Sequence, residues 1–322
     1  MRSCLWIATV ALLLFSTTVA AIGAAPAERG PYAIAALSES LRDADRGRTI
    51  DFLVLYPAPG QAPALPAAPF PLIVFNHGFL LNGSAYRSYG EHLVSHGFVV
   101  ALPTCPMSLF DLNHTTLAQD VRFVIDRCLA LSETEGHALH GLVDPDGIGL
   151  SGHSLGGKLA LLEAASDDRV RAAALLDPVD GGGPVAPDPV RYPSVAPELM
   201  PQIRIPLLFV GAELGGEVVV FTACAPREEN YQRFFEAANP PAIEVTQIEV
   251  GHAQYLDPGA NALAVASCAQ GDVPGEWVRS VSAAYLTALF LGTLKGDVAA
   301  LVWLDERLGE DEAAGRIRVR RK

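Results

Sequence analysis

The sequence predicts an α/β protein in which helices cover both faces of a mostly parallel central sheet, and three observations support this. Apolar runs that are too continuous for half-exposed strands recur along the chain, as expected for strands buried on both sides. Segments with helical character separate these runs, which is the strand-then-helix order of parallel sheets. One run leads into a Gly-x-Ser-x-Gly turn at residues 152–156, and another helical segment follows it.

Each element of this fold has its own pattern in the chain. Residues 48–56 alternate in polarity and predict an early antiparallel strand, after a modest helix or arm at residues 32–48 and before a Pro/Ala-rich linker at residues 57–69. The remaining strands are predicted at residues 71–75, 97–102, 148–150, 171–176, 206–210 and 243–250. Helices are predicted at residues 89–96, 117–131, 158–165 and 277–294.

The predicted organisation has a single large domain. An N-terminal arm, the early strand and the linker occupy residues 22–69, the catalytic domain occupies residues 70–310, and a charged tail occupies residues 311–322. The basic cluster at residues 316–322 is predicted to be solvated. Half of the 322 residues are hydrophobic and 18% are charged, so the chain can bury a large core. The formal net charge of −13 argues against nucleic acid as a partner.

The N-terminus has the layout of a secretory signal peptide. Arg2 precedes an apolar run from Cys4 to Phe15, and small residues follow around Ala20 and Ala21. The apolar run is shorter than the roughly 20 residues that span a bilayer, so cleavage near Ala20 or Ala21 is predicted instead of a membrane anchor. With residues 1–21 removed, the mature protein is expected to be secreted or periplasmic.

Four cysteines remain after such cleavage, in a chain directed to an oxidising compartment. Two disulfides are predicted, and the most local pairing joins Cys105 to Cys128 and Cys224 to Cys268. Buried free thiols are the alternative, because free Cys is a common core residue. None of the four has the spacing of a zinc site, and no metal or cofactor is expected.

Ser154 is the predicted nucleophile. The apolar residues 148–150, the sharp turn and the helix after it form the strand–turn–helix context of a nucleophile elbow. Gly152 and Gly156 meet its steric demand, since a β-carbon at either position would clash in so tight a turn. This context favours a catalytic serine in an α/β-hydrolase fold over a chance Ser-Gly turn.

The general base of such a fold follows the last strand, which predicts His252. His77 lies in the loop after the predicted strand at residues 71–75, which is expected to supply an oxyanion donor. His153 lies in the elbow, next to Ser154. Solvated or capping roles are expected for the other histidines, which lie upstream: His92, His96, His114, His137 and His140.

The acid is left open between two carboxylates at the ends of neighbouring predicted strands. Asp177 ends the strand after the elbow helix, and Glu213 ends the next one. Asp180 and Glu217 are further options. The alternative role for any of these residues is to cap the loop that follows its strand.

Two backbone N–H groups are predicted to stabilise the oxyanion of a tetrahedral intermediate. One belongs to Leu155, next to the nucleophile, and the other to Phe79, in the loop after the strand at residues 71–75. Residues 79–81 and 106–110 are apolar and predict either a greasy substrate pocket or packing beneath covering loops. The long segments 181–201 and 214–241 are the predicted substrate-enclosing loops.

Blocks of the chain resemble the chlorophyllase family, with bacterial lipases and polyester hydrolases as more distant relatives. The similar blocks occur in the same order over roughly residues 70–295: 77–82, 95–98, 152–158, 177–181, 224–235 and 251–257. The Asp-Pro-Val-Asp-Gly block at residues 177–181 and the Cys-Ala-Pro block at residues 224–226 are the specific ones. Plant members usually carry Arg where this chain has Leu155, a change that leaves the backbone N–H in place.

The resemblance implies a Ser154, Asp177 and His252 triad and favours Asp177 as the acid. It also implies hydrolysis of the ester that joins phytol to chlorophyll, giving chlorophyllide and phytol without a cofactor. The partner would be a small-molecule ester, and membrane contact would come only through a lipid-like substrate.

Other functions fit the same residues. A broad-specificity exported lipase or a cutinase-like polyester hydrolase would use identical machinery, and an acyltransferase would differ only in its acceptor. A non-catalytic binding protein on a hydrolase scaffold is a third class, disfavoured because such proteins generally lose a triad member.

Overall fold

The computed structural model describes residues 24–58, 68–108, 110–182, 188–220, 222–260 and 262–322. The strands are β1 (Ile34–Asp43), β2 (Arg48–Pro57), β3 (Phe70–Asn76), β4 (Val99–Thr104), β5 (Val143–His153), β6 (Val170–Leu176), β7 (Leu207–Ala212), β8 (Ala242–Gln247) and β9 (Ile317–Arg321). The α-helices are α1 (Arg87–Ser95), α2 (His114–Glu133), α3 (Leu155–Ala164), α4 (Tyr231–Ala237), α5 (Ala262–Ser267), α6 (Gly275–Leu294) and α7 (Val298–Ala313). Short 3-10 helices are η1 (Gly83–Tyr86), η2 (Met200–Gln202), η3 (Glu213–Gly216) and η4 (His252–Tyr255).

The strands form one nine-stranded sheet in the order β1-β2-β4-β3-β5-β6-β7-β8-β9. The six strands from β4 to β8 in this order are parallel, and burial on both sides explains the continuous apolar sequences of β3, β4, β6 and β7. The outer strands β1, β2 and β9 run antiparallel to their neighbours. The early antiparallel strand predicted at residues 48–56 corresponds to β2.

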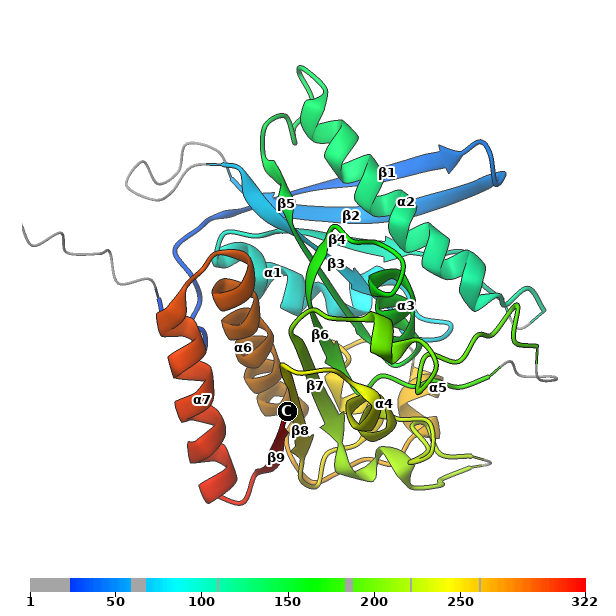
Figure 1. The fold of residues 1–322 in the computed structure, drawn as a ribbon, viewed down its shortest axis with the longest axis vertical. Helices are drawn as coiled ribbons and strands as arrows, with labels where there is room; N and C mark the ends of the chain where they lie inside the picture. The colour runs from blue at the N-terminus through cyan, green and yellow to red at the C-terminus, as the bar shows by residue number, and fades with distance from the viewer. Residues whose placement is uncertain (1–23, 59–67, 109, 183–187, 221, 261) are drawn as a thin grey trace, which may run out of the picture.

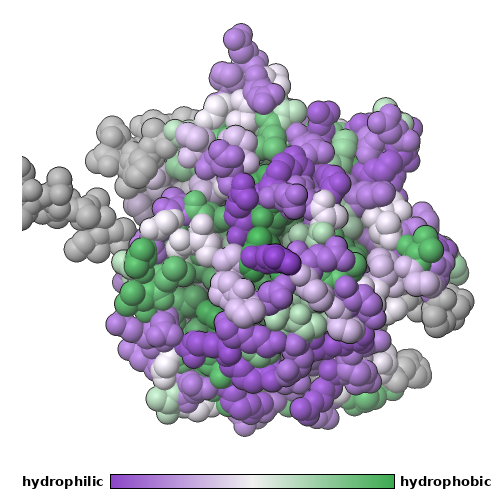
Figure 2. Space-filling model, viewed as in Figure 1, coloured by the Kyte–Doolittle hydropathy of each residue, from purple (hydrophilic) through white to green (hydrophobic). Residues whose placement is uncertain are grey.

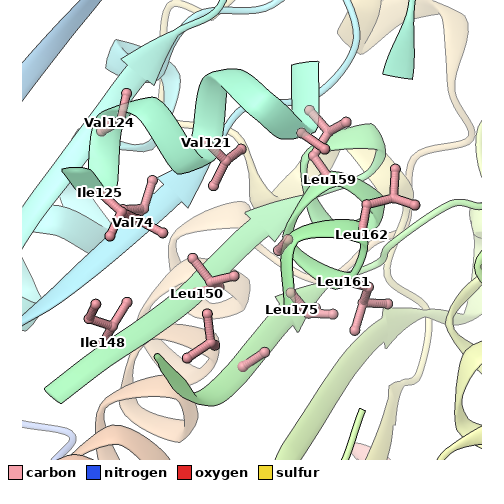
Figure 3. Close-up of a cluster of buried hydrophobic side chains, with 14 of the residues drawn as sticks. Val74, Val121, Val124, Ile125, Ile148, Leu150, Leu159, Leu161, Leu162 and Leu175 are labelled. Atoms are coloured by element: carbon pink, nitrogen blue, oxygen red, sulfur yellow. The ribbon is translucent and has the colours of Figure 1, made fainter. Parts of the chain in front are cut away.

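Helices cover both faces of the sheet (Figure 1): α2, α3 and α4 pack on one face, and α1 and α6 on the other. Figure 3 shows the core between the first face and its helices, where Val121 of α2 and Leu159 of α3 lie near Leu150 of β5. This is the α/β-hydrolase fold, as predicted. The parallel strands carry the turns after β5, β6 and β8 to the same edge of the sheet, where the active site of such a fold is expected.

Two predictions at the ends of the chain were wrong. Residues 32–48 were predicted to be a helix or an arm, but they contain β1, whose ten residues pair with β2 in a long hairpin. Residues 311–322 were predicted to be a solvated charged tail, but they contain β9, which pairs with β8. Arginines of β9 form ion pairs: Arg318 with Glu213, Arg320 with Glu236 and Glu244, and Arg321 with Asp305. Neighbouring carboxylates thus hold this basic strand on the sheet edge.

Among the described residues, α6 alone is long and apolar enough to span a membrane by length and composition, and 67% of its most apolar stretch is buried inside the protein. It lies between the sheet and α7, and a β-carbon on Gly292 would lie 2.2 Å from the Leu301 side chain of α7. Burial on both sides accounts for the apolar composition of α6.

Figure 2 shows a mostly hydrophilic face with apolar side chains over α7, where Val298 and Val302 are exposed. The predicted signal peptide, residues 1–21, lies outside the described residues.

The cysteines follow half of the predicted pairing. Cys224 and Cys268 form a disulfide with Cα atoms 5.5 Å apart, whereas Cys105 and Cys128 are free and buried, so the prediction of a second disulfide was wrong. Both free thiols pack within the apolar core beside α2 and act as small apolar side chains. Burial raises the pKa of the Cys128 thiol to about 12 and raises that of Cys105 as well, so neither is a reactive thiolate.

This arrangement predicts the thiol count. A chain cleaved after residue 21, unfolded in guanidinium without reductant, is expected to show two free thiols with Ellman's reagent, and four after reduction. A count of zero would mean that Cys105 and Cys128 do pair, and a count of four would contradict the Cys224–Cys268 disulfide.

Candidate active site

Ser154 lies in the turn between β5 and α3, with φ 57° and ψ −124°. A positive φ is rare and costly for a residue with a β-carbon, and it is the backbone conformation of a nucleophile elbow. The turn is held by the Ser154 N–H, which donates to the Leu176 carbonyl at 3.1 Å, and by the Val179 N–H, which donates to the Ser154 carbonyl at 3.2 Å. Strand β6 and the loop after it therefore hold the strained residue.

The two glycines of the motif have the steric role that the sequence predicts. A β-carbon on Gly152 would lie 2.5 Å from the backbone of Gly156. A β-carbon on Gly156 would lie 2.2 Å from the Asn76 carbonyl oxygen at the end of β3. Both contacts are closer than real β-carbons approach, so larger residues would displace the turn or the loop after β3.

His252 and Asp177 meet at the same edge of the sheet. The His252 Nδ1 lies 2.7 Å from Asp177 Oδ2, and both side chains are buried. A carboxylate accepts only, so Nδ1 carries the proton and donates it, which leaves Nε2 as the free proton acceptor. The Ala212 N–H donates to the other Asp177 oxygen at 3.2 Å. Asp177 itself has φ 39°, and this backbone conformation at the end of β6 turns it toward the end of β7.

Glu213 is engaged by other partners. Its carboxylate accepts the Glu249 N–H at 2.9 Å and pairs with Arg318 of β9 at 2.8 Å. These contacts, led by the Glu249 N–H, lower the pKa of the Glu213 carboxyl. Glu213 therefore holds the loop at Glu249 and the edge strand β9 in place.

Asp180, one of the two further candidates for the acid, is bound to structural partners and not to His252. Its side chain and that of Lys158 are fully buried, with Lys158 Nζ 3.2 Å from Asp180 Oδ1. The Asp180 carboxylate also accepts the N–H groups of Val195 and Ala196. This pair ties the loop after β6 to α3, and burial of the ammonium lowers the pKa of Lys158 despite the adjacent carboxylate.

The loop after β3 is pinned by hydrogen bonds with defined donors. His77 Nε2 accepts the Cys105 N–H at 3.0 Å, so the Nδ1 carries the proton and donates it to the Gly78 carbonyl at 2.8 Å. The Gly78 N–H donates to the Tyr86 hydroxyl at 3.1 Å. The backbone just before Phe79, the predicted oxyanion residue, is therefore fixed from both sides.

His153 links this loop to the segment that carries His252. Its Nε2 lies 3.0 Å from the His252 carbonyl, so that nitrogen donates, and its Nδ1 accepts the Tyr86 hydroxyl proton at 2.8 Å. The His153 and His252 rings are in contact at a tilt of 35°, with centroids 4.4 Å apart. Burial lowers the pKa of His153 well below its usual value, and the neighbouring His252 adds to this. A neutral His153 therefore connects the oxyanion loop, the elbow and the candidate base.

Replacing Tyr86 with Phe is expected to lower kcat for nitrophenyl butyrate roughly tenfold to hundredfold, below the effect of deleting an oxyanion donor. The change leaves the Gly78 N–H and His153 Nδ1 buried without partners, and the loop loses one of its anchors. Rates are counted per site titrated with a fluorophosphonate. Tyr285→Phe is the matched control, since it loses a buried hydroxyl of α6 that is bonded to Asp311 of α7 and has no contact with the loop after β3. Equal kcat values for the two variants would contradict the role of Tyr86.

A cavity of about 190 Å³ opens beside Ser154. Its lining is mostly apolar and includes both predicted oxyanion residues: Phe79, Leu112, His114, Ser154, Leu155, Val179, Gly181, Gly182 and Cys224. Both long segments predicted to enclose the substrate contribute, through Gly181 and through Cys224. A second cavity of about 330 Å³ adjoins the same loop at Leu80 and Leu81.

Sequence reasoning missed several groups of this site. His114 was predicted to be solvated or capping, but it is 2% exposed and lines the cavity beside Ser154. His96, which lies outside the site, was assigned the same role and is also buried, and its Nε2 donates to the Glu28 carbonyl. His153 was assigned to the elbow with no further role, and the Tyr86 hydroxyl was not considered. Within the part of the chain that the structure describes, no three His, Cys, Asp or Glu side chains gather as a metal site would require.

Comparison with known proteins identifies the family of this chain. Residues 60–309 match the family model described as chlorophyllase. Chlorophyllase-2 of Arabidopsis thaliana is 28% identical over 257 residues, which cover 75% of this chain and 79% of the relative. Chlorophyllase-1 of Arabidopsis thaliana is 28% identical over 73% of this chain and 75% of its own, and the chloroplastic chlorophyllase-1 of Citrus unshiu is 26% identical over 71% and 70%. The chain therefore belongs to the chlorophyllase family of ester hydrolases.

Proposed function

We propose that this protein is a serine carboxylesterase that cleaves the phytyl ester of chlorophyll, with Ser154 as nucleophile, His252 as base and Asp177 as acid. The observation that carries the proposal is the 2.7 Å contact between His252 and Asp177 at the sheet edge that also bears the strained Ser154. The family match supports chlorophyll as the substrate.

The first half of the reaction forms an acyl-enzyme. His252 Nε2 takes the Ser154 hydroxyl proton while Oγ attacks the ester carbonyl, and the Leu155 and Phe79 N–H groups stabilise the oxyanion. His252 then returns the proton to the alcohol oxygen, and phytol leaves. Asp177 keeps the imidazole in the Nδ1–H tautomer and stabilises its charged form.

The second half repeats these steps with water. His252 removes a proton from a water molecule, whose oxygen attacks the acyl carbon, and the collapse of the second tetrahedral intermediate returns the proton to Ser154. The products are chlorophyllide and the free enzyme. Side chains of the protein carry out every proton transfer in these reaction steps, so the proposed reaction needs no cofactor.

We also propose that the protein is exported. The apolar N-terminal segment supports this, and so does the Cys224–Cys268 disulfide, which persists best in an oxidising compartment. N-terminal sequencing of the mature protein from a periplasmic or medium fraction is expected to begin after Ala20 or Ala21. An unprocessed N-terminus in a cytosolic fraction would contradict export.

A substrate panel tests the proposed function against the lipase and polyester alternatives. The mature protein is given detergent-dispersed chlorophyll a, triolein, a polyester film and nitrophenyl butyrate in parallel. The proposal expects chlorophyllide and cleavage of the butyrate. Film clearing or fatty-acid release without chlorophyllide would retain the esterase mechanism and replace the substrate, and no cleavage of any ester would overturn the mechanism.

A further inference from the structure

His114 is the one polar side chain besides Ser154 among the described residues that line the 190 Å³ cavity. Its ring is almost completely buried, yet neither ring nitrogen has a hydrogen-bond partner within the described chain, and Nδ1 is fully enclosed. Buried polar groups are almost always paired, and an unpaired one costs about 1–3 kcal/mol. A phenylalanine or leucine would fill this wall without that cost.

The ring is held in a fixed place. His114 is the first residue of α2, and its N–H donates to the Arg191 carbonyl at 2.7 Å. The Tyr192 ring packs against the imidazole edge to face, with centroids 5.0 Å apart. The covering loop that follows β6 therefore positions the imidazole in the cavity wall, so a ligand meets a preset group.

The protonation state of His114 follows from its surroundings. Burial lowers its pKa to about 3, and the nearby Lys158 ammonium adds to this, so the ring is charged only below that pH and is neutral during turnover. A neutral imidazole has one N–H and one bare nitrogen. An enclosed N–H without an acceptor is rarer than an enclosed bare nitrogen, which favours the bare nitrogen at Nδ1 and the proton on Nε2. The ring nitrogen left for a ligand is thus a hydrogen-bond donor.

We propose that His114 forms a polar subsite for the acyl part of the substrate, in which its Nε2–H donates to an oxygen acceptor such as a ketone or a second ester carbonyl. The inference rests on the proposed acyl-enzyme at Ser154. The cavity is lined by Ser154 and Leu155, beside the reacting carbonyl, and the subsite is assigned to the group that stays bonded to the serine after the alcohol leaves. The preferred substrates are therefore esters of oxo-acids or of diacid half-esters, in place of plain alkanoates.

Matched nitrophenyl esters test this subsite. The probes are the hexanoate, the 4-oxohexanoate and the 5-oxohexanoate, which differ by one carbonyl at two positions, and spontaneous hydrolysis is subtracted. The readout is the ratio of kcat/KM for each oxo ester to that of the hexanoate. The wild-type ratio is expected to be about tenfold for at least one oxo ester, the value of one hydrogen bond. It is expected to be constant between pH 6 and 9, because His114 stays neutral there.

Two variants assign the preference to His114. His114→Phe keeps a flat ring without the donor and is expected to bring the ratio near one, and His114→Asn, which keeps an N–H, is expected to retain part of it. His96→Phe replaces a buried histidine on the other side of the sheet and is the control, with the wild-type ratio expected. A wild-type ratio near one for both oxo esters, or an unchanged ratio in His114→Phe, would overturn the subsite.

The same assay separates this inference from the proposed function. Hexanoate hydrolysis that depends on Ser154 retains the esterase mechanism even when no oxo preference is found. Hydrolysis of all three esters by Ser154→Ala would instead remove the acyl-enzyme on which the subsite rests.

Discussion

Replacing Ser154 or His252 with Ala is expected to lower kcat for nitrophenyl butyrate by about 10⁵- to 10⁶-fold, because nucleophile and base act as one unit. Without Ser154 no acyl-enzyme forms, and without His252 the hydroxyl keeps its proton. The double variant is expected to be no slower than either single variant, since each change already removes the whole unit. Steady-state kinetics on the three purified variants measures these effects.

The control for these variants is a measurement of the melting temperature, which shows whether each variant is folded. Ser154→Ala removes one oxygen from a partly exposed side chain whose hydroxyl has no hydrogen-bond partner among the described residues, and Ala keeps the same backbone conformation. Its melting temperature is therefore expected to match that of the wild type. A folded Ser154→Ala variant with wild-type activity would contradict the mechanism, as would losses that multiply in the double variant.

Replacing Asp177 with Asn is expected to lower kcat by about 10³- to 10⁴-fold with little change in KM. The amide can donate a hydrogen to His252 Nδ1, which moves the ring proton to Nε2 and removes the base. The variant has nearly the same shape, so the loss reports the tautomer and the charge. The measurement is kcat and KM per site titrated with a fluorophosphonate.

Glu213→Gln is the matched control for Asp177→Asn. It makes the same chemical change at the end of the neighbouring strand, where the carboxylate holds Glu249 and Arg318. We expect kcat within about twofold of wild type, and a small loss of melting temperature, because a surface ion pair contributes roughly 0–1 kcal/mol. The reverse ranking of the two variants would move the acid to Glu213.

The elbow was the feature most readily predicted from sequence, because its chemistry is local. Gly152, Ser154 and Gly156 are demanded by one turn, and the backbone contacts of that turn explain each of them. The parallel strands were also predictable, since burial on both faces leaves long apolar runs. The choice between Asp177 and Glu213 was not local. Both residues end neighbouring strands, and the positive φ of Asp177 that turns its carboxylate to His252 leaves no mark in the sequence.

The features that sequence reasoning missed depend on distant partners. Strand β9 reads as a solvated basic tail until Glu236, Glu244 and Asp305 are placed beside it. Cys105 and Cys128 are closer in sequence than Cys224 and Cys268, yet the distant pair is the bonded one. His114 reads as a polar residue at a helix start, and only the covering loop packed against it makes it part of a cavity.

The central claim is that Ser154 attacks the carbonyl carbon of the phytyl ester, and hydrolysis of chlorophyll a in ¹⁸O-labelled water tests it most directly. Mass spectrometry of both products follows the label, with Ser154→Ala run beside the wild type. We expect chlorophyllide with one ¹⁸O in its new carboxylate, unlabelled phytol, and no product from the variant. Label in the phytol, or chlorophyllide from Ser154→Ala, would contradict the claim.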